Sequence, residues 1–452
     1  MNLLAPQAVL AAGVVGALGL GLRRRSSGAA ARVLALAAPL IALLALCRLL
    51  ASGSTGAPLP PLIHLDLKGL YWQAAIYLGA LPLAVLSSGD DVETALFLGA
   101  TLGMGLLAAA ATLPMLFVGL EFMSLPAYLL VARAGEGNAR GRLEAAVKYF
   151  FAGAFAGAMF LLGMSLYYAA TGSLAAVAGP IGPEAQAGLA LMGAAALFKA
   201  GSVPLHWWLP DVYEASSPEV AGFLSTSMKA AAVLFLMRIV ALAPQAEFAS
   251  ALPALGALTT LVGAILALRQ KRLQRLLAYS SLAHAGLLIL GVGAWAALGR
   301  GPQATLALLF YVVAYAFMSN GVFLFLKASG LETREQLRGY AARRPWLAAA
   351  FAVLLLSLGG IPPTGGFLAK FLVLWQAVRA SLWGPALVAA LAALASLGYY
   401  LGLVRDAYFE EPAGAAPAEG CKTAALVVGL CALGALLLGA APLLMGGLGV
   451  WR

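Results

Sequence analysis

Long apolar runs, separated by short stretches rich in Gly, Pro, Asp and Arg, follow one another along this chain. Many runs are roughly 17 to 25 residues long, and a helix of that length crosses a hydrocarbon layer of about 30 Å. The pattern predicts an all-α, polytopic membrane protein, with residues 1–452 forming a single integral membrane domain. Fourteen transmembrane helices are expected, roughly at residues 6–22, 32–50, 69–88, 94–111, 112–132, 146–170, 185–209, 218–241, 249–268, 276–298, 303–327, 346–378, 382–405 and 423–447.

The composition agrees with this prediction and excludes a soluble domain. Hydrophobic residues make up 62% of the chain and charged residues only 10%. The first apolar run is followed, not preceded, by the basic cluster Arg23, Arg24 and Arg25, which reverses the order of a cleaved signal peptide. We expect this run to remain as a membrane anchor.

Basic residues are distributed unevenly between the loops. Most of the 28 Lys and Arg residues fall in odd-numbered loops, whereas even-numbered loops and span ends hold only Arg48, Lys68, Arg238, Arg300 and Arg379. Because cytoplasmic loops carry the excess of positive charge, the odd-numbered loops are expected to be cytoplasmic and both termini non-cytoplasmic. The net charge of +10 is thereby explained by the lipid bilayer, without a nucleic-acid partner.

Motifs for cofactors or metals are not found. Cys47, Cys421 and Cys431 have no CxxC spacing, which argues against an iron–sulfur or zinc site in this chain. Two GxGxxA strings begin at Gly103 and Gly291, but no strand precedes them, so we interpret them as helix-packing glycines. No cofactor-binding and no metal-binding residue is predicted.

Four charged residues lie deep inside apolar runs: Glu121, Lys199, Lys229 and Lys370. Each costs about 2.5 to 3.5 kcal/mol on membrane-insertion scales, so each requires a reason. Internal salt bridges alone would need balanced charges, which three lysines and one glutamate do not provide. We favour a proton relay, because a lysine out of water holds its proton less tightly and a nearby carboxylate makes it hold the proton more tightly.

His284 is a fifth titratable group near the middle of an apolar run. Histidine titrates near neutral pH, which suits it to pass a proton between lysines. A lone histidine in such a run is equally often a hydrogen-bonded packing residue. The sequence leaves both interpretations open.

Helix-breaking residues accompany two of the lysines. Pro204 follows Lys199 closely, and proline removes a backbone donor and clashes with the preceding turn. In the twelfth span, the stretch GGIPPTGG with Pro362 and Pro363 lies just before Lys370. Irregular backbone at membrane depth is tolerated only where it is buried in protein or lines a wet cavity. The seventh and twelfth helices are therefore predicted to be broken, and the breaks to mark an ion path.

Two pairs of matching strings indicate an internal repeat. Val-Pro at 203–204 and Ile-Pro at 361–362 lie 158 positions apart, while SLPAYLLV from Ser124 and SLAHAGLL from Ser281 lie 157 apart. Each pair joins spans five apart, so the two copies would cross the membrane in opposite senses, as in transporters with paired broken helices. The predicted copies are residues 94–241 and 249–408.

Taken together, these stretches resemble the antiporter-like membrane subunits shared by respiratory complex I and Mrp-type cation/proton antiporters. The resemblance is carried by GLEFMSLPAYLL, EAAVKYFFAGAFAGA, FKAGSVPLHWWLPDVYEASSPEVAGFLSTSMKAAAVLFLMR, RLLAYSSLAHAGLLILGV and GIPPTGGFLAKF, within residues 115 to 375. It implies fourteen transmembrane helices, two inverted five-helix repeats and a proton channel. Lys370 places the chain with the subunit types that carry lysine, not glutamate, at that position.

The resemblance also implies roles for single residues. The implied relay consists of Glu121, Lys199, Lys229, His284 and Lys370. In this relay Glu121 modulates Lys199, and Lys370 ends the second half-channel. Lys148 and Glu144 belong to EAAVKYF, one of the matching stretches, and we place them near the cytoplasmic boundary of the membrane. We therefore expect them to take part in proton uptake or in a subunit interface, not in the core relay.

The leading hypothesis is a proton-translocating membrane subunit of NADH:quinone oxidoreductase in the bacterial plasma (inner) membrane. NAD, FMN, iron–sulfur clusters and quinone would then be bound by partner subunits, which include other membrane subunits, among them antiporter-like neighbours, and peripheral subunits. Two alternatives stay open: an Mrp-type cation/proton antiporter subunit and a membrane scaffold that moves no ions.

Overall fold

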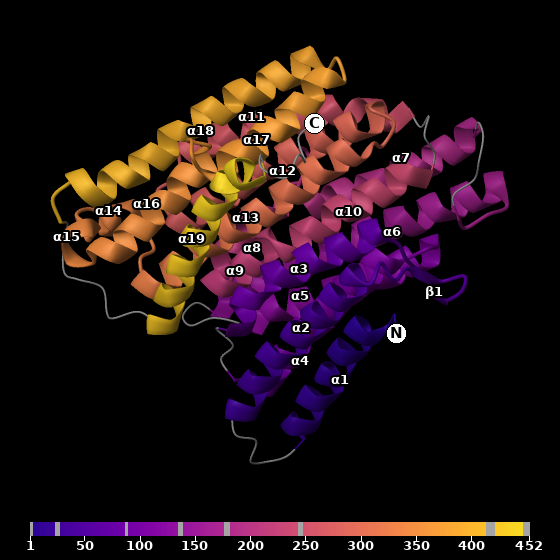
Figure 1. The fold of residues 1–452 in the computed structure, drawn as a ribbon, viewed down its shortest axis with the longest axis horizontal. Coiled ribbons are helices and arrows are strands. Elements are labelled where there is room, and N and C mark those ends of the chain that lie inside the picture. Colours follow the sequence, from indigo (N-terminus) through magenta and orange to yellow (C-terminus); the bar gives the residue numbers. More distant parts are fainter. Residues whose placement is uncertain are drawn as a thin grey trace. The chain divides into compact units, whose positions relative to one another are not determined.

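The structure, a computed structural model, describes residues 3–22, 28–85, 89–133, 139–175, 181–242, 247–412 and 421–445. The basic cluster Arg23, Arg24 and Arg25, on which the anchor prediction depends, lies outside these ranges. The chain forms two compact units, Met1–Ala251 and Leu252–Arg452. Helices dominate each unit (Figure 1).

The first unit holds α1 (Ala5–Gly21), α2 (Gly28–Ala51), α3 (Leu67–Val85), α4 (Asp91–Ala109), α5 (Leu113–Arg133), α6 (Ala139–Thr171), α7 (Pro183–Ala200), α8 (Trp208–Ala215), α9 (Pro218–Ser225), α10 (Ser227–Leu242) and the start of α11 (Glu247–Leu268). α4 contacts α1, α3, α5 and α10, while α6 contacts α5, α7 and α8. α10 contacts α3, α4, α7 and α9, so its apolar surface is covered on several sides.

A short antiparallel hairpin joins α2 to α3 in this unit. Its strands are β1 (Gly56–Leu59) and β2 (Ile63–Leu65). The hairpin was not predicted, because strands of three or four residues in a Gly- and Pro-rich stretch show no alternating pattern. The all-α class of the fold is unchanged by it.

The second unit holds the rest of α11, α12 (Leu273–Ala297), α13 (Pro302–Ser329), α14 (Arg334–Leu337), α15 (Tyr340–Arg343), α16 (Pro345–Gly359), α17 (Gly365–Arg379), α18 (Trp383–Phe409) and α19 (Lys422–Met445). α13 contacts α12, α16, α17 and α19, and α17 contacts α12, α13, α18 and α19. The broken pair α16 and α17 thus lies among the other helices of its unit.

Local chemistry explains where many helices begin and end. Pro183 and Pro302 lie in the first turns of α7 and α13, where the missing N–H costs nothing and the fixed φ favours the helix. Gly201 and Gly330 follow the ends of the same helices with φ of 80° and 69°, a conformation that other residues rarely adopt. Asp90 caps α4 by accepting a hydrogen bond from the backbone N–H of Glu93 at 2.8 Å.

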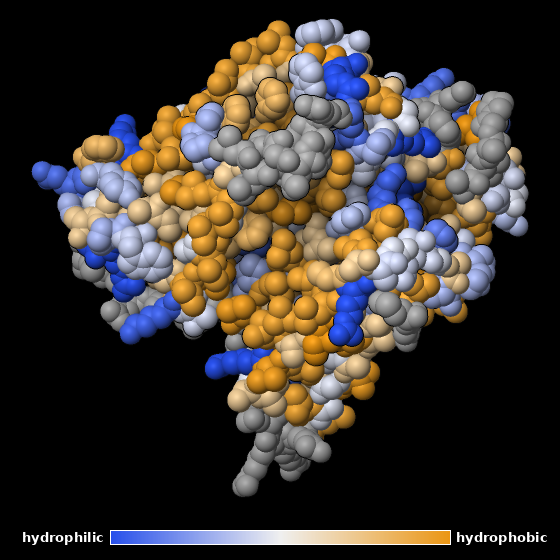
Figure 2. Space-filling view, in the orientation of Figure 1, coloured by the Kyte–Doolittle hydropathy of each residue, from blue (hydrophilic) through white to orange (hydrophobic). Residues whose placement is uncertain are grey.

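The structure confirms the polytopic membrane class. Among the described residues, ten helical stretches are long and apolar enough to cross a membrane, and α1 and α16 are shorter apolar helices. Each predicted span falls on one helix or one pair of consecutive helices, while the count of fourteen crossings stays a prediction. Figure 2 shows apolar side chains over much of the visible surface of each unit, as expected for helices that face lipid.

Both predicted helix breaks are present. α7 ends at Ala200 and α8 begins at Trp208, with Pro204 between them. α16 ends at Gly359 and α17 begins at Gly365, with Pro362 and Pro363 between them. The seventh and twelfth predicted spans are therefore each divided into two helices, as the proline and glycine content indicated.

A third interruption, between α9 and α10, was not predicted. Thr226 separates the two helices with φ of −106° and ψ of −79°. Its hydroxyl donates to the Gly222 carbonyl at 2.8 Å, and the Ser227 hydroxyl donates to the Ile76 carbonyl of α3 at 2.9 Å. The run Ser225, Thr226, Ser227 was the available sequence signal, because hydroxyl side chains compete for backbone groups inside helices.

The two GxGxxA strings serve helix packing, as predicted. A Cβ atom at Gly103 would overlap the backbone of Met123 in α5, and one at Gly291 would lie 2.7 Å from the Leu308 side chain in α13. Gly103 therefore lets α4 and α5 approach at the distance typical of small residues in membrane helix pairs.

We expect Gly103→Ala to lower the melting temperature of the purified chain in detergent. The added methyl group meets backbone that cannot move aside, and overpacking costs about 1–3 kcal/mol. Gly19→Ala in α1 is the matched control, because nothing lies within 4 Å of its added Cβ. Equal melting temperatures for both variants would contradict the close approach of α4 and α5.

Candidate functional site

Lys199 lies in the last turn of α7 and is only 8% exposed. Its Nζ donates a hydrogen bond to the Tyr149 hydroxyl at 3.4 Å. The same Nζ lies 5.0 Å from the ring centroid of Tyr149 and 5.2 Å from that of Tyr128. Two tyrosine rings thus surround the ammonium group and compensate part of its lost hydration.

The first helix break completes the surroundings of Lys199. Trp208, the first residue of α8, stacks on Tyr149 with ring centroids 4.4 Å apart, and Tyr128 meets Tyr149 edge-on at 4.5 Å. We call Tyr128, Tyr149 and Trp208 the aromatic cluster. Because α7 ends at Ala200, the chain can return and place Trp208 against α6.

Glu121 lies on α5 and is partly buried. Glu121 and Tyr128 are seven residues apart, so both project from one face of α5. Opposite them on α6, a Cβ at Gly157 would lie 3.0 Å from Glu121 Oε1, and a Cβ at Gly153 would overlap the Tyr128 hydroxyl. These two glycines make room for both side chains.

Glu121 and Lys199 are not in direct contact. In the described part of the chain, no ion pair within 4.0 Å joins their side chains. Two opposite charges at a larger separation in a poorly polarisable medium still interact. We therefore expect Lys199 to be sensitive to the charge of Glu121, and their partnership stays a prediction.

Lys148 and Glu144 lie on α6 beside the aromatic cluster. Lys148 Nζ lies 2.9 Å from Glu144 Oε1 and 3.2 Å from Asp211 Oδ2 of α8. All three side chains are substantially exposed, at 42% for Lys148, 64% for Glu144 and 34% for Asp211. We call them the Lys148 cluster; Lys148 directly precedes Tyr149, so the cluster adjoins the surroundings of Lys199.

Asp211 was not predicted as a site residue. It belongs to the PDVY stretch that follows the first break. Its pairing with Lys148 depends on α8 folding back onto α6. No residue spacing in the sequence indicates that α8 folds back onto α6.

Lys229 lies in α10, three residues after the interruption at Thr226, and is 3% exposed. α10 contacts α7, the helix that carries Lys199, and also α3, α4 and α9. The structure thus brings Glu121, Lys199 and Lys229 into the same compact unit. His284 and Lys370 belong to the second unit.

His284 is buried in α12 and has a tyrosine hydroxyl at each ring nitrogen. Nδ1 lies 2.7 Å from the Tyr311 hydroxyl of α13, and Nε2 lies 3.3 Å from the Tyr400 hydroxyl of α18. Tyr400 in turn shares a hydrogen bond with Ser280, one turn before His284. Such a chain of hydroxyl and imidazole groups can pass a proton, and it also holds the ring in place, so both interpretations of His284 remain.

The tyrosines around His284 were not predicted. Tyr311 and Tyr315 are four residues apart on α13, and the Tyr315 ring lies 4.8 Å from the imidazole. That spacing places both rings on one helix face, a pattern visible in the sequence. Tyr400 comes from the neighbouring helix α18, and only the fold brings it to α12.

Lys370 is 7% exposed on α17 and contacts the second break. Its Nζ donates a hydrogen bond to the carbonyl oxygen of Gly359, the last residue of α16, at 3.0 Å. The carbonyls at a helix end have no partner within the helix and carry partial negative charge. In a continuous helix, the Gly359 carbonyl would accept a hydrogen bond from a backbone N–H group of the same helix. Because the helix is broken here, this carbonyl accepts the hydrogen bond from Lys370 instead.

The backbone of the second break is held by protein groups. The Ser357 hydroxyl accepts a hydrogen bond from the N–H of Gly366 at 3.1 Å. α19 packs against one side of the break, since a Cβ at Gly439 would overlap the Pro363 carbonyl. Ser357 and Thr364 are buried, while Pro204, Pro362 and Pro363 face outward from the chain. The wet cavity expected beside each break stays a prediction.

No group of three or more His, Cys, Asp or Glu within the described ranges is arranged to hold a metal ion. The ionisable groups assembled by the fold are instead lysines, carboxylates, one imidazole and tyrosine hydroxyls. Their chemistry is the binding and release of protons.

The fold and these buried groups define a class: polytopic helical membrane proteins with ionisable side chains beside broken helices. The chain belongs to the family described as NADH:quinone oxidoreductase/Mrp antiporter, TM, whose sequence pattern matches residues 110–396. It is 42% identical over 330 residues to NADH-quinone oxidoreductase subunit 14 of Thermus thermophilus, covering 72% of this chain and 73% of that protein. It is 36% identical over 384 residues to NADH-quinone oxidoreductase subunit N of Xanthomonas euvesicatoria, covering 81% and 74%.

Solved structures agree with this family. A chain of respiratory complex I from Thermus thermophilus with bound aureothin matches with a TM-score of 0.86 and 36% identity, over 97% of this chain and 98% of that chain. A chain of the Mrp complex from Dietzia sp. matches with a TM-score of 0.85 and 22% identity, over 98% and 95%. The second likeness concerns the fold alone. The predicted family and fold are thereby confirmed.

We expect the Lys148–Asp211 ion pair to add little to stability. Exposed pairs are screened by solvent and contribute about 0–1 kcal/mol. A double-mutant cycle with Lys148→Ala, Asp211→Ala and the double variant should give a coupling within that range, measured by thermal unfolding in detergent. A coupling of several kcal/mol would contradict the exposure seen here and would make the pair a structural clamp.

Proposed function

We propose that this chain is a proton-translocating membrane subunit of NADH:quinone oxidoreductase (complex I). The observation that carries the proposal is that Lys199, Lys229 and Lys370 are each more than nine-tenths buried. The free energy of keeping three ammonium groups away from water is large. Lys199 and Lys370 lie beside the two breaks that contain proline, and Lys229 lies three residues after the interruption at Thr226.

In the first unit, the proton is taken up near the Lys148 cluster and reaches Lys199 through Tyr149. Tyr149 directly follows Lys148 in α6, and its hydroxyl contacts Lys199 Nζ. Glu121 sets how firmly Lys199 holds the proton, because a negative carboxylate favours the charged lysine. A change in the charge or distance of Glu121 then releases the proton towards Lys229.

In the second unit, His284 and Lys370 continue the relay. His284 exchanges protons with the hydroxyls of Tyr311 and Tyr400, which lie at its two ring nitrogens. Lys370 rests on the Gly359 carbonyl, whose partial charge favours the charged lysine less strongly than a carboxylate would. In the proposed relay, Lys370 passes its proton to the next acceptor.

The inverted five-helix repeats, residues 94–241 and 249–408, form part of this proposal. Gly201 and Gly360, 159 positions apart, end α7 and α16 with φ of 80° and 85°, and each N–H is bonded to the carbonyls three and four residues earlier. The same local ending at this offset supports a duplicated unit. Opposite orientation of the copies would let each unit open to one face of the membrane.

The redox chemistry belongs to other chains in this proposal. NAD, FMN, iron–sulfur clusters and quinone are bound by partner subunits, and this chain binds no cofactor. Its partners are other subunits of complex I, including neighbouring antiporter-like subunits. The chain resides in the bacterial plasma membrane, with both termini on the non-cytoplasmic side, as its charge distribution indicates.

Two alternative functions can be distinguished from this proposal by observation. An Mrp-type cation/proton antiporter subunit would use the same fold, and the genes beside this one distinguish it from a complex I subunit. A scaffold without transport would tolerate the loss of any buried lysine. The relatives cited above are oxidoreductase subunits, which favours the first proposal.

Lys199→Ala and Glu121→Ala are each expected to lower proton pumping several-fold in the assembled complex. Each variant removes one member of the pair that sets proton affinity at Lys199. Glu121→Asp keeps the charge and should be milder. Pumping is measured with a pH-sensitive dye in proteoliposomes, with NADH oxidation followed in parallel. The matched control is Lys271→Ala, an exposed lysine of the second unit; wild-type pumping by assembled Lys199→Ala would favour the scaffold.

Lys229→Arg is expected to impair pumping about as much as Lys229→Ala. A guanidinium keeps its proton at any working pH, so the variant preserves charge and loses proton exchange. Lys271→Arg is the control for the same substitution at an exposed site. Full pumping by Lys229→Arg would show that the position needs only a fixed positive charge, and the relay through it would be abandoned.

A further inference from the structure

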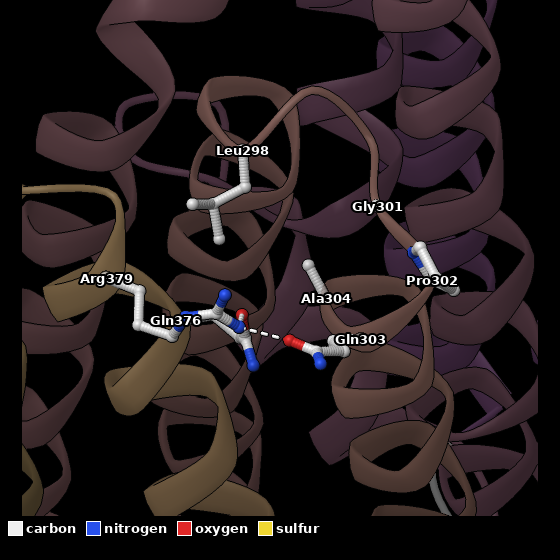
Figure 3. A pocket seen from close by; sticks show the side chains of 7 residues that line it. All are labelled: Leu298, Gly301, Pro302, Gln303, Ala304, Gln376 and Arg379. Atoms are coloured by element: carbon white, nitrogen blue, oxygen red, sulfur yellow. Dashed lines mark hydrogen bonds between the residues drawn. The ribbon is translucent and has the colours of Figure 1, made fainter. Parts of the chain in front are cut away.

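A cavity with a volume of about 220 Å³ lies in the second unit, at the end of α17 that carries Arg379 (Figure 3). It is lined by Leu298, Gly301, Pro302, Gln303, Ala304, Gln376 and Arg379. The lining combines an apolar wall with one guanidinium and two side-chain amides. We call this cavity the Arg379 pocket; none of the relay residues lines it.

The guanidinium in the Arg379 pocket lacks a counter-charge. Its Nη1 donates to the side-chain oxygens of Gln303 and, at 3.4 Å, of Gln376. Throughout the described residues, no carboxylate lies within 4.0 Å of Arg379, and the segments 296–305 and 374–384 contain no Asp or Glu. Neutral amide oxygens satisfy hydrogen bonds but do not neutralise a full positive charge.

Further donors face the same space. Gln376 is only 6% exposed and lines the pocket, and because its Oε1 accepts the hydrogen bond from Arg379, its Nε2 amino group is the donor that it offers to a ligand. The first turn of α13, with Gln303 and Ala304, also lines the pocket, and the N–H groups of a first turn have no partner inside the helix. Guanidinium, buried amide and helix N-terminus all favour an anion with several oxygens.

Tryptophans at this end of the unit indicate the level of the lipid headgroups. Trp375 lies one turn before Arg379 and is 50% exposed, and Trp383 opens α18 and is 65% exposed. Tryptophan is enriched where the membrane meets water, because its ring is apolar and its N–H is polar. An anion at this depth can be part of a lipid as well as a solute.

We propose that the Arg379 pocket binds a phosphate oxyanion, either the headgroup phosphate of an anionic phospholipid or free inorganic phosphate. The oxyanion accepts hydrogen bonds from the Arg379 guanidinium and from Gln376 Nε2, and the apolar wall of Leu298, Pro302 and Ala304 receives the carbon atoms next to a lipid headgroup. When the oxyanion binds, the Arg379 guanidinium gives up its hydrogen bond to the side-chain oxygen of Gln303 and donates to the charged oxyanion instead. This site is independent of the proton relay.

The test measures binding to the full-length chain purified in detergent. Lipid is followed by native mass spectrometry after incubation with phosphatidylglycerol or phosphatidylcholine, and inorganic phosphate is followed by the shift in melting temperature. Wild-type protein should retain bound phosphatidylglycerol in preference to phosphatidylcholine if the source is lipid, or be stabilised by millimolar phosphate more than by chloride if the source is the free ion. Either result supports the site. If the wild-type protein shows no preference for phosphatidylglycerol and no stabilisation by phosphate, the proposal is overturned.

Three variants test where the anion binds. Arg379→Gln is expected to weaken it about tenfold or more, because hydrogen bonds to charged groups contribute about 1.5–3 kcal/mol. Arg338→Gln, which removes an exposed arginine of the same unit outside the pocket, should leave binding unchanged. Gln376→Leu keeps the charge and removes the amide donor, so it tests the pocket should Arg379→Gln fail to fold. Binding that is equal in all variants and wild type would place the anion elsewhere and overturn the proposal.

Discussion

An ammonium group inside a membrane protein must receive electrostatic compensation from the protein, because the water that normally provides it is absent. This requirement governs the surroundings of Lys199 and Lys370. Lys199 has two tyrosine rings beside its ammonium group, whereas Lys370 has the carbonyl at the end of α16. Strong compensation stabilises the bound proton and weaker compensation favours its release, so differences between these environments would give direction to the proposed relay.

Helix breaks meet the same requirement with backbone groups. A continuous helix consumes its carbonyls in internal hydrogen bonds, while an interrupted one exposes them at membrane depth. At the second break the exposed carbonyl of Gly359 bonds Lys370, and Ser357 holds the start of α17. At the first break the return of the chain brings Trp208 and Asp211 onto α6. The interruptions therefore build both the charge environment and the packing around it.

Small residues decide where large polar side chains can be buried. Gly153 and Gly157 of α6 leave the space that Tyr128 and Glu121 occupy, and Gly439 of α19 lets that helix reach the second break. With a Cβ at these positions, the side chains would turn away or the helices would move apart. The buried polar groups thus depend on the absence of side chains on the facing helix, a relation between segments distant in sequence.

What the sequence determined by itself follows from local chemistry. Apolar run length, the position of Pro204 and of Pro362-Pro363, and the rarity of charge inside these runs predicted the class of fold, two of its breaks and the buried lysines. Tertiary structure alone decided that Asp211 pairs with Lys148, that Tyr149 contacts Lys199, and that Tyr400 reaches His284. These pairs join different helices, and their distances depend on how helices cross and how closely glycines let them approach. A one-dimensional pattern shows that a charge needs a partner, but only the packed helices determine which residue that partner is.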